Sequence, residues 1–270
     1  ILEANRRDLE AAERTGLATP LLNRLRLSDA KLQTLREGVL QLAGTADPLG
    51  GVVSRTELDD GLVLSRVRSP IGVLLVIFES RPDAVVQIGS LALRTGNAVL
   101  LKGGSEAAHS NRAPVDCLSG ALEAEGQSPE AVQGVEGRER VAALLEHDQL
   151  IDLVIPRGSG ELVRSIQRAT RIPVLGHAEG ICHLYLHADA DPEMAARLAV
   201  DGKCDYPAAC NATETMLVHA DFLPHLPRVA GALTEAGVEL RCDERARPHA
   251  PGSIAAGAAD GATEYGDLIL

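Results

Sequence analysis

The stretch IGVLLVIF at residues 71–78 is a continuous apolar run without polar alternation, and the residues after it, 82–95, follow a helical pattern. Strands that are buried on both faces have this composition, and they occur mainly in parallel sheets covered by helices on both sides. The same order of strand and helix recurs downstream, at 97–101, 105–125, 151–155, 160–170 and 173–175, and Pro114 is expected to interrupt the helix 105–125. The rhythm predicts an α/β fold with a Rossmann-type parallel sheet and helices on both of its faces.

The residues before this stretch predict two helices and a hairpin. Residues 1–15 and 30–42 carry apolar side chains at helical spacing, and Ser28 is typical of the N-cap of the second helix. Residues 52–67 contain two β-type runs around the turn signal DDG at 59–61. Because this hairpin stands outside the strand–helix rhythm, we expect it to be an arm for a partner subunit.

Composition excludes several classes of protein. The chain has 270 residues, of which 45% are hydrophobic, and this is enough to bury a core. With a net charge of −12 and only 2% aromatic residues it offers no surface for nucleic acid. No apolar run approaches the roughly 20 residues that cross a bilayer, so no membrane partner is expected. Five scattered cysteines without a CxxC pair predict free thiols in a reducing compartment and no metal site.

One cysteine lies where a nucleophile would be placed. The stretch KCDYPAACNATET at 203–215 follows a helical segment and leads into the strand candidate 215–219, so Cys210 lies in a loop at the mouth of a strand. Such a loop aims a thiol and leaves it accessible, and a thiolate attacks acyl carbons well. The alternative is a buried structural cysteine, since free cysteine is among the most buried residue types.

Two glycine-rich turns follow predicted strands and open predicted helices, KGGS at 102–105 and RGSG at 157–160. Backbone N–H groups at such a helix start suit phosphate oxygens, although any tight connection also needs glycine. Neither turn matches the GxGxxG or P-loop pattern. Two such turns together with an accessible thiol are typical of a dehydrogenase that handles an acyl group and a phosphate-bearing cofactor.

Five motifs occur in order along the chain: SPIGV at 69–73, FESRPD at 78–83, GNAVLLKGGSEA at 96–107, GHAEGICH at 176–183, and the stretch around Cys210. In these motifs the chain resembles the γ-glutamyl phosphate reductase family of the aldehyde dehydrogenase superfamily, and it is closest to the reductase half of Δ1-pyrroline-5-carboxylate synthase. The resemblance implies an aldehyde dehydrogenase-like fold. It places an NADP-binding domain with the N-terminal helices and the hairpin arm at 1–175, and a catalytic α/β domain, incomplete at its C-terminus, at 176–270.

The resemblance also implies the reaction. The family reduces L-glutamate 5-phosphate to L-glutamate 5-semialdehyde with NADPH and releases phosphate, in the second step of proline biosynthesis. Cys210 is then the nucleophile that forms a thioester. Asn211 is expected either to stabilise the developing oxyanion with its amide or to be a turn residue.

Further site residues follow from their places in the family motifs. The residues expected to bind NADP(H) are Lys102, Gly103, Ser105, Gly158 and Ser159. The residues expected to bind the substrate are Ser80, Arg81 and Arg157. For Lys102 and Arg81, an ordinary solvated surface residue is the alternative.

Two positions depart from the hydrolytic aldehyde dehydrogenases. Ser80 stands where those enzymes have an oxyanion Asn, and Gly176, followed by His177, stands where they have the Glu that activates water. A reductase that expels phosphate needs no such base, because an activated water would hydrolyse its thioester. We therefore assign no general base and treat His177 and His183 as structural.

The resemblance implies a small-molecule substrate, a homo-oligomer for the full-length enzyme, a fused or associated glutamate 5-kinase, and the cytoplasm, or mitochondria for a bifunctional animal enzyme. Because Ile1 lies within a helical pattern and family motifs would continue beyond Leu270, a longer natural protein is expected. Two alternatives stay open. They are another aldehyde dehydrogenase, CoA-acylating or hydrolytic, and an inactive fragment that acts as an interaction module.

Overall fold

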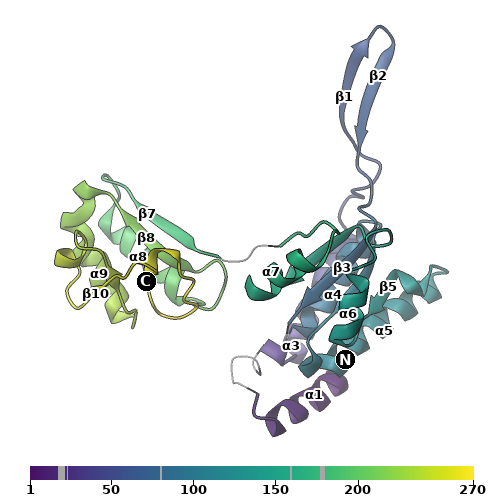
Figure 1. Cartoon of the computed structure of the whole chain (residues 1–270), viewed down its shortest axis with the longest axis horizontal. Coiled ribbons are helices and arrows are strands. Elements are labelled where there is room, and N and C mark those ends of the chain that lie inside the picture. The colour runs from purple at the N-terminus through teal and green to yellow at the C-terminus, as the bar shows by residue number, and fades with distance from the viewer. Residues whose placement is uncertain (18–21, 23, 80, 159, 177–179) are drawn as a thin grey trace. The chain divides into compact units, whose positions relative to one another are not determined.

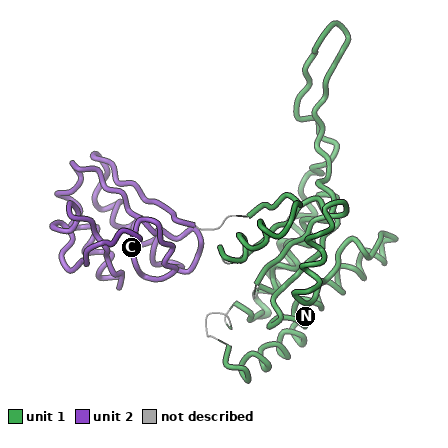
Figure 2. The backbone as a smooth tube through the Cα atoms, in the orientation of Figure 1, with its two compact units in different colours: residues 1–178 green, residues 179–270 purple. Residues whose placement is uncertain are grey.

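The computed structural model describes residues 1–17, 22, 24–79, 81–158, 160–176 and 180–270. In it the chain divides into two compact units, residues 1–178 and 179–270 (Figure 2). The sequence places its domain boundary between 175 and 176. The roles assigned there to the two parts, cofactor binding and catalysis, stay predictions.

The first unit is built on a four-stranded parallel sheet in the order β5-β4-β3-β6. Its strands are β3 (Val73–Phe78), β4 (Ala98–Lys102), β5 (Val132–Gly134) and β6 (Leu153–Arg157). Alternate residues of β3 enter different cores. Leu74, Val76 and Phe78 join one buried cluster, whereas Leu75 and Ile77 join another. The prediction of a strand buried on both faces is confirmed, because side chains of a strand alternate between the two faces of its sheet.

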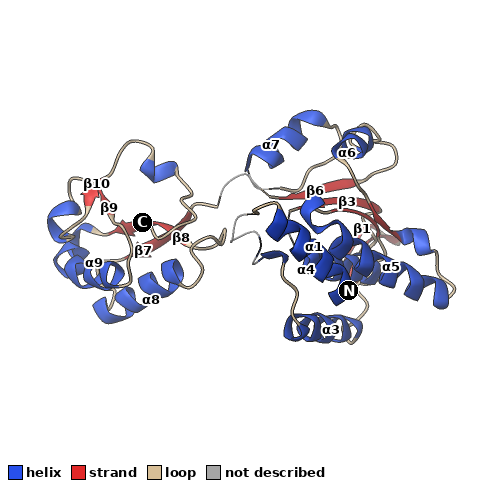
Figure 3. Ribbon diagram, turned by 90° about the horizontal axis from the view of Figure 1, so that it is seen from below, coloured by secondary structure: helices blue, strands red, loops and turns tan. Residues whose placement is uncertain are grey.

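Helices cover both faces of this sheet, as predicted (Figure 3). One face carries α4 (Pro82–Arg94) and α5 (Ala108–Ala124), and the other carries α6 (Arg138–Leu144) and α7 (Gly160–Ala169). Pro114 was expected to interrupt α5, but it is buried within a continuous helix. A proline removes one hydrogen bond, and the packing of α5 on the sheet outweighs that loss.

Four elements differ from the sequence-based expectation. The short strand β5 and the helix α6 were not predicted, since three residues and seven residues carry too little periodicity to be recognised. Residues 105–107 form a turn of 3₁₀-helix before α5 begins. The expected strand 173–175 is reduced to a single bridge between Val154 and Val174.

The N-terminal helices pack on the two helices that cover one face of the sheet, α4 and α5. Helix α1 (Leu2–Arg14) packs against α5, and α3 (Asp29–Ala43) packs against α4. Ser28 caps α3, as predicted, because its side chain accepts a hydrogen bond from the Lys31 N–H at 3.2 Å. Within the part of the chain that the structure describes, no helix is long and apolar enough to span a membrane.

The predicted hairpin is present. Strands β1 (Val52–Asp59) and β2 (Leu62–Val67) pair antiparallel, and every residue of both is exposed. Figure 1 shows the hairpin standing out from the rest of its unit. Gly61 closes the turn with φ +77°, a left-handed conformation that glycine adopts without steric cost.

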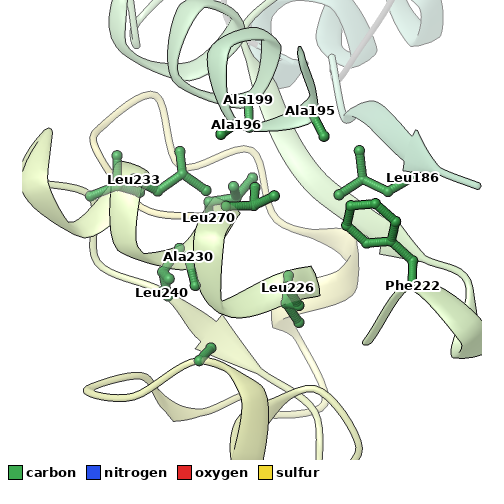
Figure 4. Close-up of a cluster of buried hydrophobic side chains, with 13 residues drawn as sticks. Leu186, Ala195, Ala196, Ala199, Phe222, Leu226, Ala230, Leu233, Leu240 and Leu270 are labelled. Carbon is green, nitrogen blue, oxygen red and sulfur yellow. The ribbon is translucent and has the colours of Figure 1, made fainter. Parts of the chain in front are cut away.

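The second unit contains a β–α–β arrangement. Strands β7 (Cys182–Leu186) and β8 (Thr213–Val218) pair in parallel, and α8 (Pro192–Cys204) connects them. Helix α9 (Leu226–Glu235) packs against α8. Figure 4 shows the core gathered there, with three small alanines of α8, Ala195, Ala196 and Ala199, that allow close packing. The short strands β9 (Arg241–Cys242) and β10 (Ile254–Ala255) complete the unit.

Candidate functional site

Cys210 lies in the loop that joins α8 to β8. It is exposed, it follows a turn in which Ala209 N–H donates to the Tyr206 carbonyl, and it lies within a second turn in which Ala212 N–H donates to the Ala209 carbonyl, both at 2.9 Å. The prediction of an accessible thiol at the mouth of a strand is thereby confirmed in its geometry. Cys204, by contrast, is half-buried against the core, and burial raises the pKa of its thiol and so disfavours its thiolate.

The carbonyl of Cys210 is held from the neighbouring strand. The Cys182 thiol donates a hydrogen bond to it at 3.4 Å. A Cβ atom at Gly180 would collide with the same carbonyl oxygen, so only glycine allows this approach. The Gly180 N–H donates in turn to Glu264 Oε2 at 2.9 Å. The start of β7 and the Cys210 loop are therefore in direct contact.

Asn211 is an exposed turn residue next to Cys210. Its neighbour Ala212 uses its N–H in the turn, so that group is engaged within the loop. The role of the Asn211 amide in stabilising an oxyanion stays a prediction.

A buried ion pair lies at the base of this loop, and neither of its residues was among the site residues predicted from the sequence. Lys203 Nζ donates to Glu214 Oε2 at 2.9 Å, and the two side chains are 0% and 1% exposed. The Glu214 carboxylate also accepts from the N–H groups of Tyr265 and Gly266, each at 3.3 Å. Helical spacing could have revealed it, because Lys203 lies four residues after the buried Ala199, on the inward face of α8.

In the first unit, the predicted cofactor and substrate residues lie at the carboxyl edge of the sheet. Lys102 ends β4 opposite Ile77, and Arg157 ends β6 opposite Phe78. Both residues therefore lie beside the carboxyl end of the central strand β3. Lys102 is half-buried and Arg157 is exposed. Arg81 is exposed at the N-cap of α4. Ligands of open parallel sheets bind at this edge. Ser80 and Ser159 lie outside the described residues, as does His177.

The two glycine-rich turns differ. At KGGS, Ser105 is exposed, and a Cβ at Gly103 would collide with the Asn111 side chain. Helix α5 begins after this turn, and the Asp8 carboxylate of α1 accepts from its His109 and Ser110 N–H groups, at 3.3 and 2.7 Å. Those two N–H groups are therefore not available to a phosphate, because α1 already supplies their anion. The expectation that the N–H groups of the KGGS turn itself bind a phosphate stays a prediction.

Gly158, in the second turn, lies beside a carboxylate that sequence reasoning did not select. A Cβ at Gly158 would be 3.0 Å from Glu79 Oε2 and 2.9 Å from Leu162 Cδ2. Glu79 is exposed and directly follows β3, which was the available signal. The edge thus combines Lys102 and Arg157 with the Glu79 carboxylate.

Gly176 occupies a crowded position. A Cβ there would lie 2.9 Å from Pro156 Cγ and 3.0 Å from Val163 Cγ1. A side chain such as the water-activating Glu would need these neighbours to move, which agrees with the absence of a general base from the predicted site.

The main cavity of the second unit lies apart from Cys210. A cavity of about 360 Å³ in the second unit is lined by residues of β8, α9 and the segment 240–265, and Cys210 is not among them. In the described ranges, no group of three or more His, Cys, Asp or Glu side chains is placed to hold a metal ion.

Comparison with known proteins gives one consistent result. A sequence model described as the aldehyde dehydrogenase family matches residues 2–250. The γ-glutamyl phosphate reductase of Cyanothece sp. (strain PCC 7425 / ATCC 29141) is 53% identical over 271 residues, and that of Prochlorococcus marinus (strain MIT 9313) is 52% identical. Each alignment covers 100% of this chain and 62% of the relative, so the chain spans less than two thirds of their length.

Solved structures agree with the sequence comparison. The crystal structure of γ-glutamyl phosphate reductase from Thermotoga maritima superposes with a TM-score of 0.94 at 36% identity, over 100% of this chain and 66% of that one. The enzyme of that name from Saccharomyces cerevisiae gives a TM-score of 0.62 at 41% identity, over 90% and 61%. An engineered glycolyl-CoA reductase with bound NADP⁺, at 19% identity and a TM-score of 0.58, shares the fold.

Proposed function

Because the chain belongs to the aldehyde dehydrogenase family, we propose that it carries the reductase chemistry of its relatives, the NADPH-dependent reduction of L-glutamate 5-phosphate to L-glutamate 5-semialdehyde with release of phosphate. The observation that carries the proposal is the 53% identity to a γ-glutamyl phosphate reductase over the whole chain. The exposed Cys210 at the mouth of β8 supports it.

The chemistry begins at Cys210. Its thiolate attacks the acyl carbon of the substrate, the carbon–phosphate oxygen bond breaks, phosphate leaves, and a γ-glutamyl thioester forms. Asn211 stabilises the developing oxyanion. NADPH, when bound, supplies a hydride to the thioester carbon. Collapse of the resulting hemithioacetal releases the aldehyde and returns the Cys210 thiolate. Gly176 carries no carboxylate that could activate water at this position, which favours preservation of the thioester for reduction.

The first unit suits a nicotinamide cofactor of the phosphorylated type. Lys102 brings a cation to the carboxyl edge of the parallel sheet, where it would pair with a 2′-phosphate, and Ser105 lies exposed three residues later. Gly103 leaves room for the Asn111 side chain beside this turn, and Gly158 and Ser159 would hold the pyrophosphate. Ser80 and Arg81 follow β3, Arg157 ends β6, and the three are assigned to the phosphate and α-carboxylate of the substrate.

The same proposal includes the oligomeric state, the partner enzyme and the cell compartment. The exposed hairpin supports a homo-oligomer for the full-length protein. A glutamate 5-kinase, fused or associated, would supply the acyl phosphate. The proposed compartment is the cytoplasm, where thiols stay reduced.

The test runs the reaction in reverse. NADPH formation is followed from pyrroline-5-carboxylate, NADP⁺ and phosphate, with the parent and with Cys210→Ser, in this chain and in a protein of the relatives' full length. Phosphate-dependent activity that the substitution abolishes is the expected result. Activity with coenzyme A in place of phosphate, or activity that survives Cys210→Ser, would contradict the proposal.

A further inference from the structure

Lys203 and Glu214 form a buried pair that joins the two ends of the loop carrying Cys210. Lys203 is in the last turn of α8 and Glu214 is the second residue of β8, so the pair closes the base of residues 205–212. Beside it, a Cβ at Gly202 would lie 2.8 Å from Thr213 Oγ1. The end of the helix and the start of the strand are thus in contact at two adjacent positions.

The same pair connects to Cys210 by a second route. The Glu214 carboxylate accepts from the N–H groups of Tyr265 and Gly266. The preceding residue, Glu264, accepts from Gly180 N–H at 2.9 Å, and Gly180 lies against the Cys210 carbonyl. A closed circuit of contacts therefore runs from Glu214 through residues 264–266 to Gly180 and Cys210.

Stability alone is a weak reason for this pair. Burying two charges carries a desolvation penalty that often equals or exceeds their attraction, and apolar residues of similar size are often at least as stabilising. A short charge-assisted hydrogen bond does, however, fix the distance and direction between two backbone segments more sharply than an apolar contact does.

We propose that Lys203 and Glu214 are positioning residues for Cys210, which hold its loop at one orientation by clamping both loop ends and the 264–266 segment. This inference rests on the proposed role of Cys210 as the nucleophile. Neither residue touches the reacting atoms. Their effect on the reaction is exerted through the backbone of the loop.

The test uses the double variant Lys203→Met with Glu214→Gln. It removes both charges but keeps volume, and the single Gln oxygen still accepts from one of the two N–H groups that Glu214 binds, that of Tyr265 or that of Gly266. The melting temperature is expected to stay near that of the parent. Hydrogen exchange at the Ala209 and Ala212 amides is expected to speed up, and kcat of the reverse reaction to fall roughly tenfold or more with KM for phosphate little changed, because small misplacements of a reacting group slow the chemical step.

A matched control lies at the other end of α8. Arg228 Nε and Nη2 donate to Glu193 Oε1 and Oε2, both at 2.7 Å, and the pair is exposed. The variant Glu193→Gln with Arg228→Met also removes one ion pair of α8, and it should leave kcat and the loop amides unchanged.

Each outcome decides the question. The inference is overturned if the Lys203→Met, Glu214→Gln protein keeps the parental kcat, or if it exchanges Ala209 and Ala212 at the parental rate. If the parent itself shows no reductase activity, the proposed function fails. The exchange rates then still decide whether the pair holds the loop.

Discussion

Gly180 lies against the main chain of the candidate nucleophile Cys210, and this contact is possible because Gly180 has no side chain. It starts the approach to β7, its N–H is bound by Glu264, and its Cα faces the Cys210 carbonyl. These contacts hold the backbone at Cys210 from residues outside its own loop. The exposed thiol is thus attached to a main chain held by neighbours that are remote in sequence.

Gly180→Ala is expected to lower kcat of the reverse reaction roughly tenfold or more, because the new Cβ forces the Cys210 carbonyl to move. Steady-state kinetics with a thermal melt measures both effects. The control is Gly231→Ala in α9, where a Cβ would meet nothing within 4 Å. That change should keep the activity and raise stability by about 0.5–1 kcal/mol. Parental activity of Gly180→Ala would contradict the role given to this contact.

Asp260 makes the stability of the second unit sensitive to acid. The Tyr265 hydroxyl, the Gly257 N–H and the Arg241 guanidinium donate to its carboxylate and lower its pKa from 3.8 to about 2. Since the folded pKa lies below the unfolded one, the stabilisation is fully present above about 4 and is lost as the pH falls toward 2.

Asp260→Asn is expected to lower the melting temperature at pH 6, with a smaller difference from the parent at pH 2.5. Melts at the two pH values measure this change. Asp201→Asn, on the exposed side of α8, should show no such pH-dependent difference. An equal deficit of Asp260→Asn at both pH values would exclude the ionised carboxylate as the cause.

At the level of elements, α1 caps a helix that is far away in sequence. Asp8 of α1 is 4% exposed, and its two carboxylate oxygens accept from the first turn of α5. Next to it, Asn5 Nδ2 donates to Ser110 Oγ at 3.0 Å and to the Leu25 carbonyl at 2.9 Å. Buried polar groups that are all satisfied specify one arrangement of the helices.

Asp8→Ala is expected to destabilise the first unit by about 1–3 kcal/mol, because the buried Ser110 N–H and the partly buried His109 N–H lose their acceptor. Urea unfolding followed by circular dichroism measures the loss. Glu13→Ala, an exposed carboxylate on the same helix, should change stability by less than about 0.5 kcal/mol. Similar losses for both variants would show that helix propensity, and not the cap, is responsible.

At the level of the whole molecule, the hairpin β1–β2 is the element that its own unit leaves uncovered. Leu58, Leu62 and Leu64 are 58%, 57% and 58% exposed, although both strands are regular. An isolated two-stranded hairpin is only marginally stable in water. Apolar side chains on it are therefore expected to be covered by another subunit.

Leu62→Lys with Leu64→Lys is expected to shift the full-length protein toward monomers, because two charges would be buried without partners at the interface. Sedimentation velocity measures the assembly, and the melting temperature of the first unit should stay the same in the monomer. Ser65→Lys, on the other face of β2, is the control. An unchanged assembly in the double variant would rule out the hairpin as the arm.

The sequence by itself determined the order of the elements and their class. The apolar run at 71–78, the Ser28 cap and the turn at 59–61 act over a few residues, and local periodicity and turn chemistry are sufficient to predict them. The five motifs indicated the family by their wording and order. The residue pattern at 203–215 predicted that Cys210 lies in an exposed loop before a strand. Short elements such as β5, and the continuation of α5 through Pro114, depended on packing and were missed.

Only the tertiary structure decided which residues surround these elements. The Lys203–Glu214 pair, the Asp8 cap of α5 and the contact of Gly180 with Cys210 join segments that no periodicity relates. A buried polar group must find a partner, but its sequence neighbourhood does not say which one. That choice follows from the packing of α8 against β8 and of α1 on α5, because this packing decides which groups come within hydrogen-bonding distance of each buried charge.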